Sequence, residues 1–145
     1  IKLIKKTLDF LKLTSKNPIN IVNKTNNKFI KGDDDQLNRV FINLIKNSEE
    51  SFLEQMRKEP NFKGNIDIEI DDNKDYIVIR IKDNGTGISD SKKAMTPYFT
   101  TKKTGTGLGL PIVTKIINEH SGKFSIKNKS DKSGTIVTIS LPKYV

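Results

Sequence analysis

The sequence predicts an α/β (α+β) sandwich of two layers, in which a mixed β-sheet carries helices on one face. This prediction rests on segments with an apolar stripe at helical spacing, which occur among segments in which apolar and polar residues alternate. At 145 residues, the chain has the length of one ordinary domain with a single core. We therefore expect one domain over residues 1–145.

One short helix and two short strands are expected near the N-terminus. Ile4, Leu8 and Leu11 recur at helical spacing, which predicts a helix from Lys2 to Leu13. Two strand-like stretches are expected between Pro18 and Ile30.

The clearest helix runs from Asp34 to Lys58. Apolar residues recur along it at helical spacing, and the aspartates from Asp33 to Asp35 can cap its first turn. After Gly64, alternating isoleucines from Ile66 to Ile70 and a second strand from Tyr76 to Lys82 predict a hairpin.

The last third combines an irregular segment with a helix and two strands. Residues from Ser89 to Thr106 have no clean periodicity, so we expect a loop or lid there. A helix from about Gly107 to His120 should follow, with Gly122 as its cap. Strands from Lys123 to Lys127 and from Thr135 to Leu141 are expected to complete the sheet.

Composition disfavours several classes of function. The net charge is +9, but nearly all basic residues are lysines, whereas base-reading and bidentate phosphate sites favour arginine, so we expect no nucleic-acid partner. The chain has no cysteine, which excludes disulfides and thiolate metal sites and suits a cytoplasmic domain. No apolar run reaches the roughly 18 residues of a membrane span, although a parent protein could carry a membrane anchor.

Asn43 and Asn47 are the first group of candidate functional residues. They lie four residues apart on the predicted helix, so both side chains project from one face beside the apolar stripe. Mg²⁺ accepts amide oxygens alongside phosphate oxygens and water, which makes an asparagine here a candidate ligand. Taken alone, the pair is better explained as two exposed helix asparagines.

The second group is the run Asp83-Asn84-Gly85-Thr86-Gly87-Ile88, directly after a predicted strand. The carboxylate of Asp83 can accept a hydrogen bond from an exocyclic amine such as that of adenine, and the glycines let the backbone approach a flat base. The alternative is an ordinary turn that closes the strand.

The third group is Gly105-Thr106-Gly107-Leu108-Gly109-Leu110, which leads into a predicted helix. Backbone N–H groups at such a helix N-terminus can face phosphate oxygens. The spacing matches neither the dinucleotide-binding fingerprint nor a Walker A sequence, so the common P-loop class is excluded.

With Pro97-Tyr98-Phe99-Thr100-Thr101-Lys102 between the second and third groups, this order closely resembles the catalytic ATP-binding domain of two-component sensor histidine kinases. The resemblance covers roughly residues 1–145, and Leu37 to Ser51 match that family's N box. The stretch from Pro97 to Gly122 is most similar to nitrogen-regulation kinases of the NtrB and NtrY type. The resemblance implies the Bergerat-type ATP-binding sandwich shared with gyrase, the Hsp90 chaperones and MutL, with an ATP lid between the second-last helix and the sheet.

The resemblance also implies which residues bind ATP. Asn47 would hold a magnesium ion, Asp83 would bond the adenine amine, and Thr135 would join the adenine network through water. Lys102 could reach the phosphates, and the glycines of the third group would hinge the lid. The full expected set is Asn43, Asn47, Asp83, Gly85, Gly87, Ile88, Lys102, Gly105, Thr106, Gly107, Leu108, Gly109 and Thr135.

Two positions depart from the family pattern. Glu50 stands where some members have a phosphate-contacting lysine, so Lys102 or Lys103 would have to supply that charge. Ser121-Gly122 replaces the usual pair of glycines after the second helix, which we expect to alter only the helix cap.

Three functions are compatible with these residues. The first is a kinase module that transfers the γ-phosphoryl group of ATP to a histidine on a partner domain. Gyrase-type hydrolysis is disfavoured, because the related ATPases carry a general-base glutamate where this chain has Asn43, and a neutral amide cannot take a proton from water. A non-catalytic nucleotide sensor stays open. The implied partners of a kinase are its own dimerisation and phosphoacceptor domain and a downstream response regulator.

No catalytic residue is assigned with certainty. The single histidine, His120, should lie about 15–20 Å from the phosphate-facing glycines at 1.5 Å per helical residue, so we expect it to interact with the helix C-terminus rather than to accept phosphate. The chain begins at Ile1 without an initiator methionine, which suggests excision from a longer protein that carries the acceptor on a separate domain.

Overall fold

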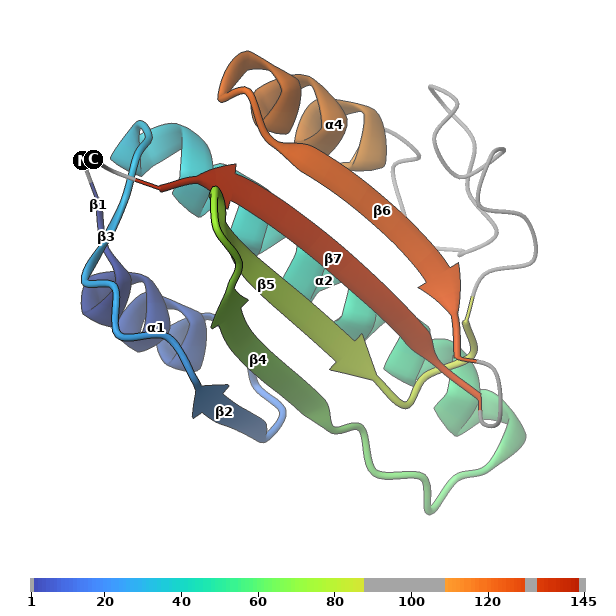
Figure 1. Ribbon diagram of the computed structural model, residues 1–145. Helices are drawn as coiled ribbons and strands as arrows, with labels where there is room; N and C mark the ends of the chain where they lie inside the picture. The colour runs from blue at the N-terminus through green and yellow to red at the C-terminus, as the bar shows by residue number, and fades with distance from the viewer. Residues whose placement is uncertain (1, 88–108, 130–132, 144–145) are drawn as a thin grey trace.

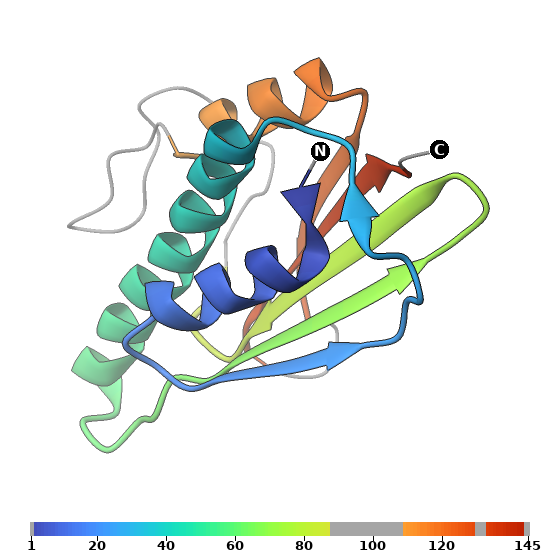
Figure 2. The same cartoon turned by 90° about the vertical axis from the view of Figure 1, so that its left-hand side faces the viewer.

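The computed structural model describes residues 2–87, 109–129 and 133–143. These residues form two layers, a five-stranded sheet and helices that cover one of its faces (Figures 1 and 2). The predicted fold class is therefore confirmed. The loop or lid expected from Ser89 to Thr106 lies outside the described residues.

The sheet is mixed, as predicted. Its strand order is β2-β4-β5-β7-β6, with β2 parallel to β4 and every other neighbouring pair antiparallel. Alternation of apolar and polar residues turns one face of each strand toward the helices, so the isoleucines of β4 at 66, 68 and 70 are buried. The strands are β2 (Ile19–Asn23), β4 (Ile66–Asp72), β5 (Tyr76–Asp83), β6 (Lys123–Asn128) and β7 (Thr135–Pro142).

The long helix α2 (Asp34–Lys58) has the predicted bounds and carries most of the helical layer. Asp33 caps it, because its carboxylate accepts a hydrogen bond from the backbone N–H of Gln36 at 2.8 Å. The helix α4 (Gly109–Glu119) packs beside α2; in Figure 1, α2 passes behind the sheet and α4 is seen above β6. The buried face of α2 is formed by Leu37, Val40, Phe41, Leu44, Ile45, Ser48, Ser51 and Phe52.

The first helix begins later than predicted. Residues Lys2–Leu3 form strand β1, which pairs antiparallel with β3 (Phe29–Ile30), and α1 (Ile4–Thr14) follows directly. Helical spacing alone suggested an earlier start. The backbone of the first two described residues instead pairs with a strand far along the chain, and local periodicity does not report such a partner.

The C-terminal cap of α4 also differs in detail from the expectation. Ser121, not Gly122, has the left-handed conformation, with φ = 57°. The N–H of Gly122 donates to the carbonyl of Ile117 at 2.9 Å and the N–H of Ser121 to that of Asn118 at 3.0 Å, which is a Schellman cap. Gly122 is needed for space, since a Cβ atom there would lie 2.5 Å from the Ser140 carbonyl oxygen.

None of the helices within the described ranges has the combined length and apolar character that a bilayer span requires.

Candidate functional site

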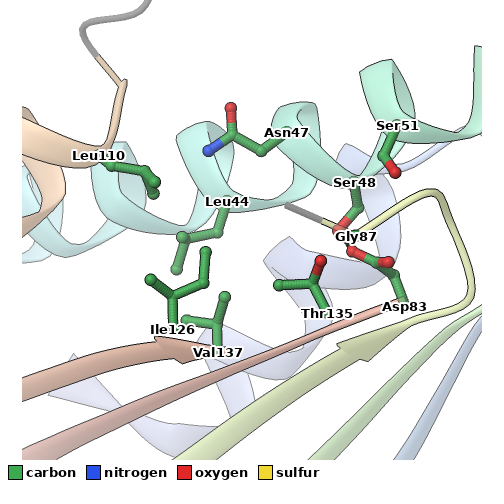
Figure 3. Close-up of a pocket in the computed structure, with 10 residues that line it drawn as sticks. All are labelled: Leu44, Asn47, Ser48, Ser51, Asp83, Gly87, Leu110, Ile126, Thr135 and Val137. Carbon is green, nitrogen blue, oxygen red and sulfur yellow. Dashed lines mark hydrogen bonds between the residues drawn. The ribbon is translucent and has the colours of Figure 1, made fainter. Parts of the chain in front are cut away.

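A pocket lies between α2, the first turn of α4 and the ends of β5, β6 and β7 (Figure 3). It encloses about 380 Å³ of space, including its open mouth. The apolar side chains gather on one side, and all polar side chains except Asn47, which lies above Leu44, gather on the other. This arrangement suits a flat base that needs a few fixed polar contacts. The lining residues are Leu44, Asn47, Ser48, Ser51, Asp83, Gly87, Leu110, Ile126, Thr135 and Val137.

Asp83 provides the only carboxylate among these lining residues. It is the last residue of β5 and lies opposite Thr135, the first residue of β7, and both are less than 10% exposed. Its carboxylate accepts hydrogen bonds from the Ser48 hydroxyl at 2.8 Å and from the Gly85 N–H at 3.0 Å. Because each carboxylate oxygen has two lone pairs, Asp83 can accept a further bond from a donor in the pocket.

The run after Asp83 is fixed against α2. A Cβ atom at Gly85 would overlap the Ser51 hydroxyl oxygen, so only glycine fits there. That hydroxyl oxygen also accepts a hydrogen bond from the Thr86 N–H at 2.7 Å. Gly87 has φ = 79°, which favours glycine, and it lines the pocket. The run is therefore more than a free-standing turn, since its backbone forms part of the pocket wall.

The structure brings Asn43, Asn47 and Gly109 together. A Cβ atom at Gly109 would lie 3.5 Å from Asn43 Oδ1 and 3.6 Å from Asn47 Oδ1, so both amide oxygens are close to the first residue of α4. The Asn43 amide N–H donates to the Arg39 carbonyl at 2.9 Å. The predicted asparagine pair and the last glycine of the third group are thus neighbours, and Asn47 is the one of the three that lines the pocket.

An Asn-based magnesium site is chemically reasonable here. Amide oxygens are acceptable ligands for Mg²⁺ when phosphate oxygens and water complete its shell. Among the described residues, no cluster of three or more His, Cys, Asp or Glu could hold a metal ion alone. A metal ion at Asn47 would take phosphate oxygens and water as further ligands.

Several predicted site residues lie outside the described parts of the chain. They are Ile88, Lys102, Gly105, Thr106, Gly107 and Leu108.

Two pocket residues, Ser48 and Ser51, were not singled out from the sequence. Each is 4% exposed; Ser48 bonds Asp83, the last residue of β5, and Ser51 bonds Thr86 in the segment that follows. Their spacing could have identified them. They follow Leu44 by four and seven residues, which places two hydroxyl groups on the buried stripe of α2. Buried hydroxyl groups need partners, so their position alone indicates a polar contact in the interior.

His120 lies at the end of α4 and does not line the pocket. Its Nδ1 bonds the Ile116 carbonyl at 2.8 Å, and its Nε2 accepts the Asp33 N–H at 3.0 Å. This pattern assigns the proton to Nδ1 of a neutral ring. One of its bonds satisfies a carbonyl in the last turn of α4, as expected for a residue at this position.

A mixed sheet with helices on one face and a pocket between α2 and the ends of β5 and β7 makes the chain an α/β sandwich with a candidate ligand site between its two layers. The family described as histidine kinase-, DNA gyrase B-, and HSP90-like ATPase matches residues 32–145, and the chain belongs to this family.

Similar proteins include sensor kinases. Sporulation kinase C of Bacillus subtilis (strain 168) is 37% identical over 121 residues, covering 82% of this chain and 26% of the kinase. A protein of Rickettsia typhi (strain ATCC VR-144 / Wilmington), named as an NtrY-like sensor histidine kinase, is 40% identical over 109 residues, covering 74% of this chain and 17% of that protein. The chain thus spans about a quarter or less of these relatives.

The fold agrees with a solved kinase domain. The nucleotide-free catalytic domain of histidine kinase ThkA has a TM-score of 0.67 and 28% identity, covering 97% of this chain and 84% of that one. Together these comparisons confirm the predicted resemblance, and with it the function class of an ATP-dependent catalytic domain of histidine kinases.

Proposed function

We propose that this chain binds ATP with Mg²⁺ and transfers the γ-phosphoryl group to a histidine on a separate dimerisation domain. Both domains would belong to a longer kinase, and this one would lie in the cytoplasm. A response regulator would then receive the phosphoryl group from the histidine. The observation that carries the proposal is the buried Asp83 carboxylate at the polar end of a pocket whose other end is apolar. This arrangement favours a base that has an apolar face and an exocyclic amine, as adenine does.

The two ends of the pocket suggest how ATP lies. The adenine amine would donate to Asp83, while Leu44, Ile126 and Val137 contact the ring. The phosphates would extend toward Asn47 and the N-terminus of α4, where the helix dipole favours negative charge. A Mg²⁺ ion held by Asn47 would neutralise charge on the phosphates during transfer.

Transfer is favoured over gyrase-type hydrolysis by Asn43. Its amide N–H is engaged with the Arg39 carbonyl, and its Oδ1 is an amide oxygen without useful basicity. The side chain can help to position a phosphate or a metal ligand, but it cannot activate water. The phosphoryl group would therefore pass to an acceptor that supplies its own nucleophile.

Calorimetry on two variants tests this assignment. Asn47→Ala should weaken binding of Mg-ATP about tenfold or more, yet weaken metal-free ATP binding much less, because it removes a metal ligand. Asp83→Asn should reduce the preference for adenine over other bases, since it replaces two acceptors by one acceptor and a donor. Asn118→Ala, which changes an exposed asparagine of α4, is the matched control and should bind as wild type. Wild-type affinity and selectivity in both site variants would disprove the assignment.

A further inference from the structure

We infer that Ser48 is a positioning residue for base selection: its hydroxyl group holds the Asp83 carboxylate in the orientation that accepts the exocyclic amine of adenine. This inference rests on the proposed function, because it assigns a task within the same nucleotide site.

The hydroxyl group of Ser48 is directed across the interface between helix and sheet. It donates to Asp83 Oδ2 at 2.8 Å, and the two residues are 4% and 6% exposed. A serine within a helix commonly bonds back to the carbonyl one turn earlier. Here the bond goes to a strand residue 35 positions away, and both side chains line the pocket (Figure 3).

Two donors from different elements hold the carboxylate. Ser48 on α2 bonds Oδ2, and the backbone N–H of Gly85 bonds Oδ1 at 3.0 Å. With one donor on each oxygen, rotation about the bond between Cβ and the carboxyl carbon would break both contacts. The remaining lone pairs therefore keep fixed directions relative to the pocket.

A fixed acceptor discriminates between bases through the group that faces it. An amine in the correct place forms a charge-assisted hydrogen bond, which is stronger than a bond between neutral groups. A base with hydrogen at that position forms no such bond, whatever the orientation of Asp83. Loss of the Ser48 hydroxyl should consequently reduce affinity only for nucleotides that carry the amine.

The test compares two nucleotides on the complete chain. ATP and the purine ribonucleoside triphosphate that has hydrogen in place of the exocyclic amine are titrated into wild type and Ser48→Ala in the presence of Mg²⁺. We expect Ser48→Ala to lower ATP affinity about tenfold, equivalent to about 1.4 kcal/mol, and to change the affinity for the analogue less than about twofold. Equal losses for the two nucleotides would indicate direct base contact or packing, and no loss would show that the hydroxyl is dispensable; either result overturns the inference.

Three further variants make the outcome decisive. Ser48→Thr keeps a hydroxyl group and should prefer ATP over the analogue as wild type does. Ser48→Cys keeps nearly the same volume but has only a weak donor, so it should lose the preference for ATP. Ser48→Cys also replaces Ser48→Ala if the alanine variant fails to fold, as judged by circular dichroism. Ser140→Ala, on the sheet face turned away from the helices, is the serine control and should leave both affinities unchanged.

The same titrations separate this inference from the proposed function. If wild type binds neither nucleotide, the proposed function fails. If wild type prefers ATP and Asp83→Asn abolishes that preference while Ser48→Ala retains it, only the role of Ser48 is overturned.

Discussion

At the scale of single residues, Ser51 occupies the space into which a side chain at Gly85 would extend. Its hydroxyl oxygen accepts the Thr86 N–H, so it cannot move aside without leaving a backbone donor unsatisfied. Gly134 likewise has no room for a side chain, because a Cβ atom there would overlap the Asp83 carbonyl oxygen. The position of the Asp83 carboxylate therefore depends on close backbone packing from two directions.

Replacing Gly85 should be costly. In Gly85→Ala the added methyl group forces Ser51 or the backbone to shift, and we expect the free energy of unfolding to fall by about 1–3 kcal/mol. Urea denaturation measures this change. Gly109→Ala is a matched glycine variant, since its Cβ atom would lie at an ordinary contact distance of 3.5 Å from its nearest neighbour, and it should retain wild-type stability. Equal stability of the two variants would contradict the packing argument.

The positions of some candidate site residues were predictable where they depend on local sequence. Asp83, Gly85 and Gly87 follow a strand in a recognisable run, and the structure places Asp83 and Gly87 at the pocket. The hydrogen bond between Ser48 and Asp83 was not predictable, because the two residues lie 35 positions apart and meet only through the way α2 crosses the sheet. Periodicity places a side chain on a helix face, but it does not identify what that face contacts.

At the scale of secondary-structure elements, the end of α4 contains an unfavourable residue. Ser121 adopts φ = 57°, a left-handed conformation that costs a non-glycine residue roughly 1–2 kcal/mol. Its neighbour Gly122 does not have a positive φ; glycine is needed there because a Cβ atom would collide with the Ser140 carbonyl oxygen. The two adjacent positions therefore constrain their residues for different reasons.

Opposite effects are expected from substitutions at these two positions. Ser121→Gly should raise the free energy of unfolding by about 1 kcal/mol, because glycine enters the left-handed region freely. Gly122→Ala should lower it, since its Cβ atom would press against β7 and Ile117. Thermal unfolding of both variants measures the difference. A loss of stability in Ser121→Gly would show that the serine side chain makes a compensating contact.

Element bounds followed from the sequence where the signals are local. The bounds of α2 agree with those predicted because an aspartate cap and a long apolar stripe define them. The start of α1 was misplaced, since β1 forms by pairing with β3, more than 20 residues away. Contacts between distant segments override local helical spacing.

At the scale of the whole molecule, the only histidine lies away from the pocket that we propose to bind ATP. His120 lies 11 residues after Gly109, about 16 Å along the helix, and both of its ring nitrogens are engaged. In-line transfer needs the acceptor nitrogen beside the γ-phosphorus atom.

The isolated chain should therefore fail to phosphorylate itself. Incubation with γ-labelled ATP should leave it without acid-labile label, whereas addition of the dimerisation domain that we propose as its partner should give label on that domain. A His120→Gln chain should behave identically in both assays. Acid-labile label on His120 of the isolated chain would contradict the proposal that the ATP site and the acceptor histidine lie on separate domains.

The link between His120 and Asp33 has a mechanical consequence. It attaches the last turn of α4 to the cap of α2, so the helix has a pivot at one end and Gly109 at the other. A tilt about that pivot moves Gly109 most: each degree displaces it by about 0.3 Å over a lever of about 16 Å. Small rotations at the pivot thus become sub-ångström adjustments beside the amide oxygens of Asn43 and Asn47.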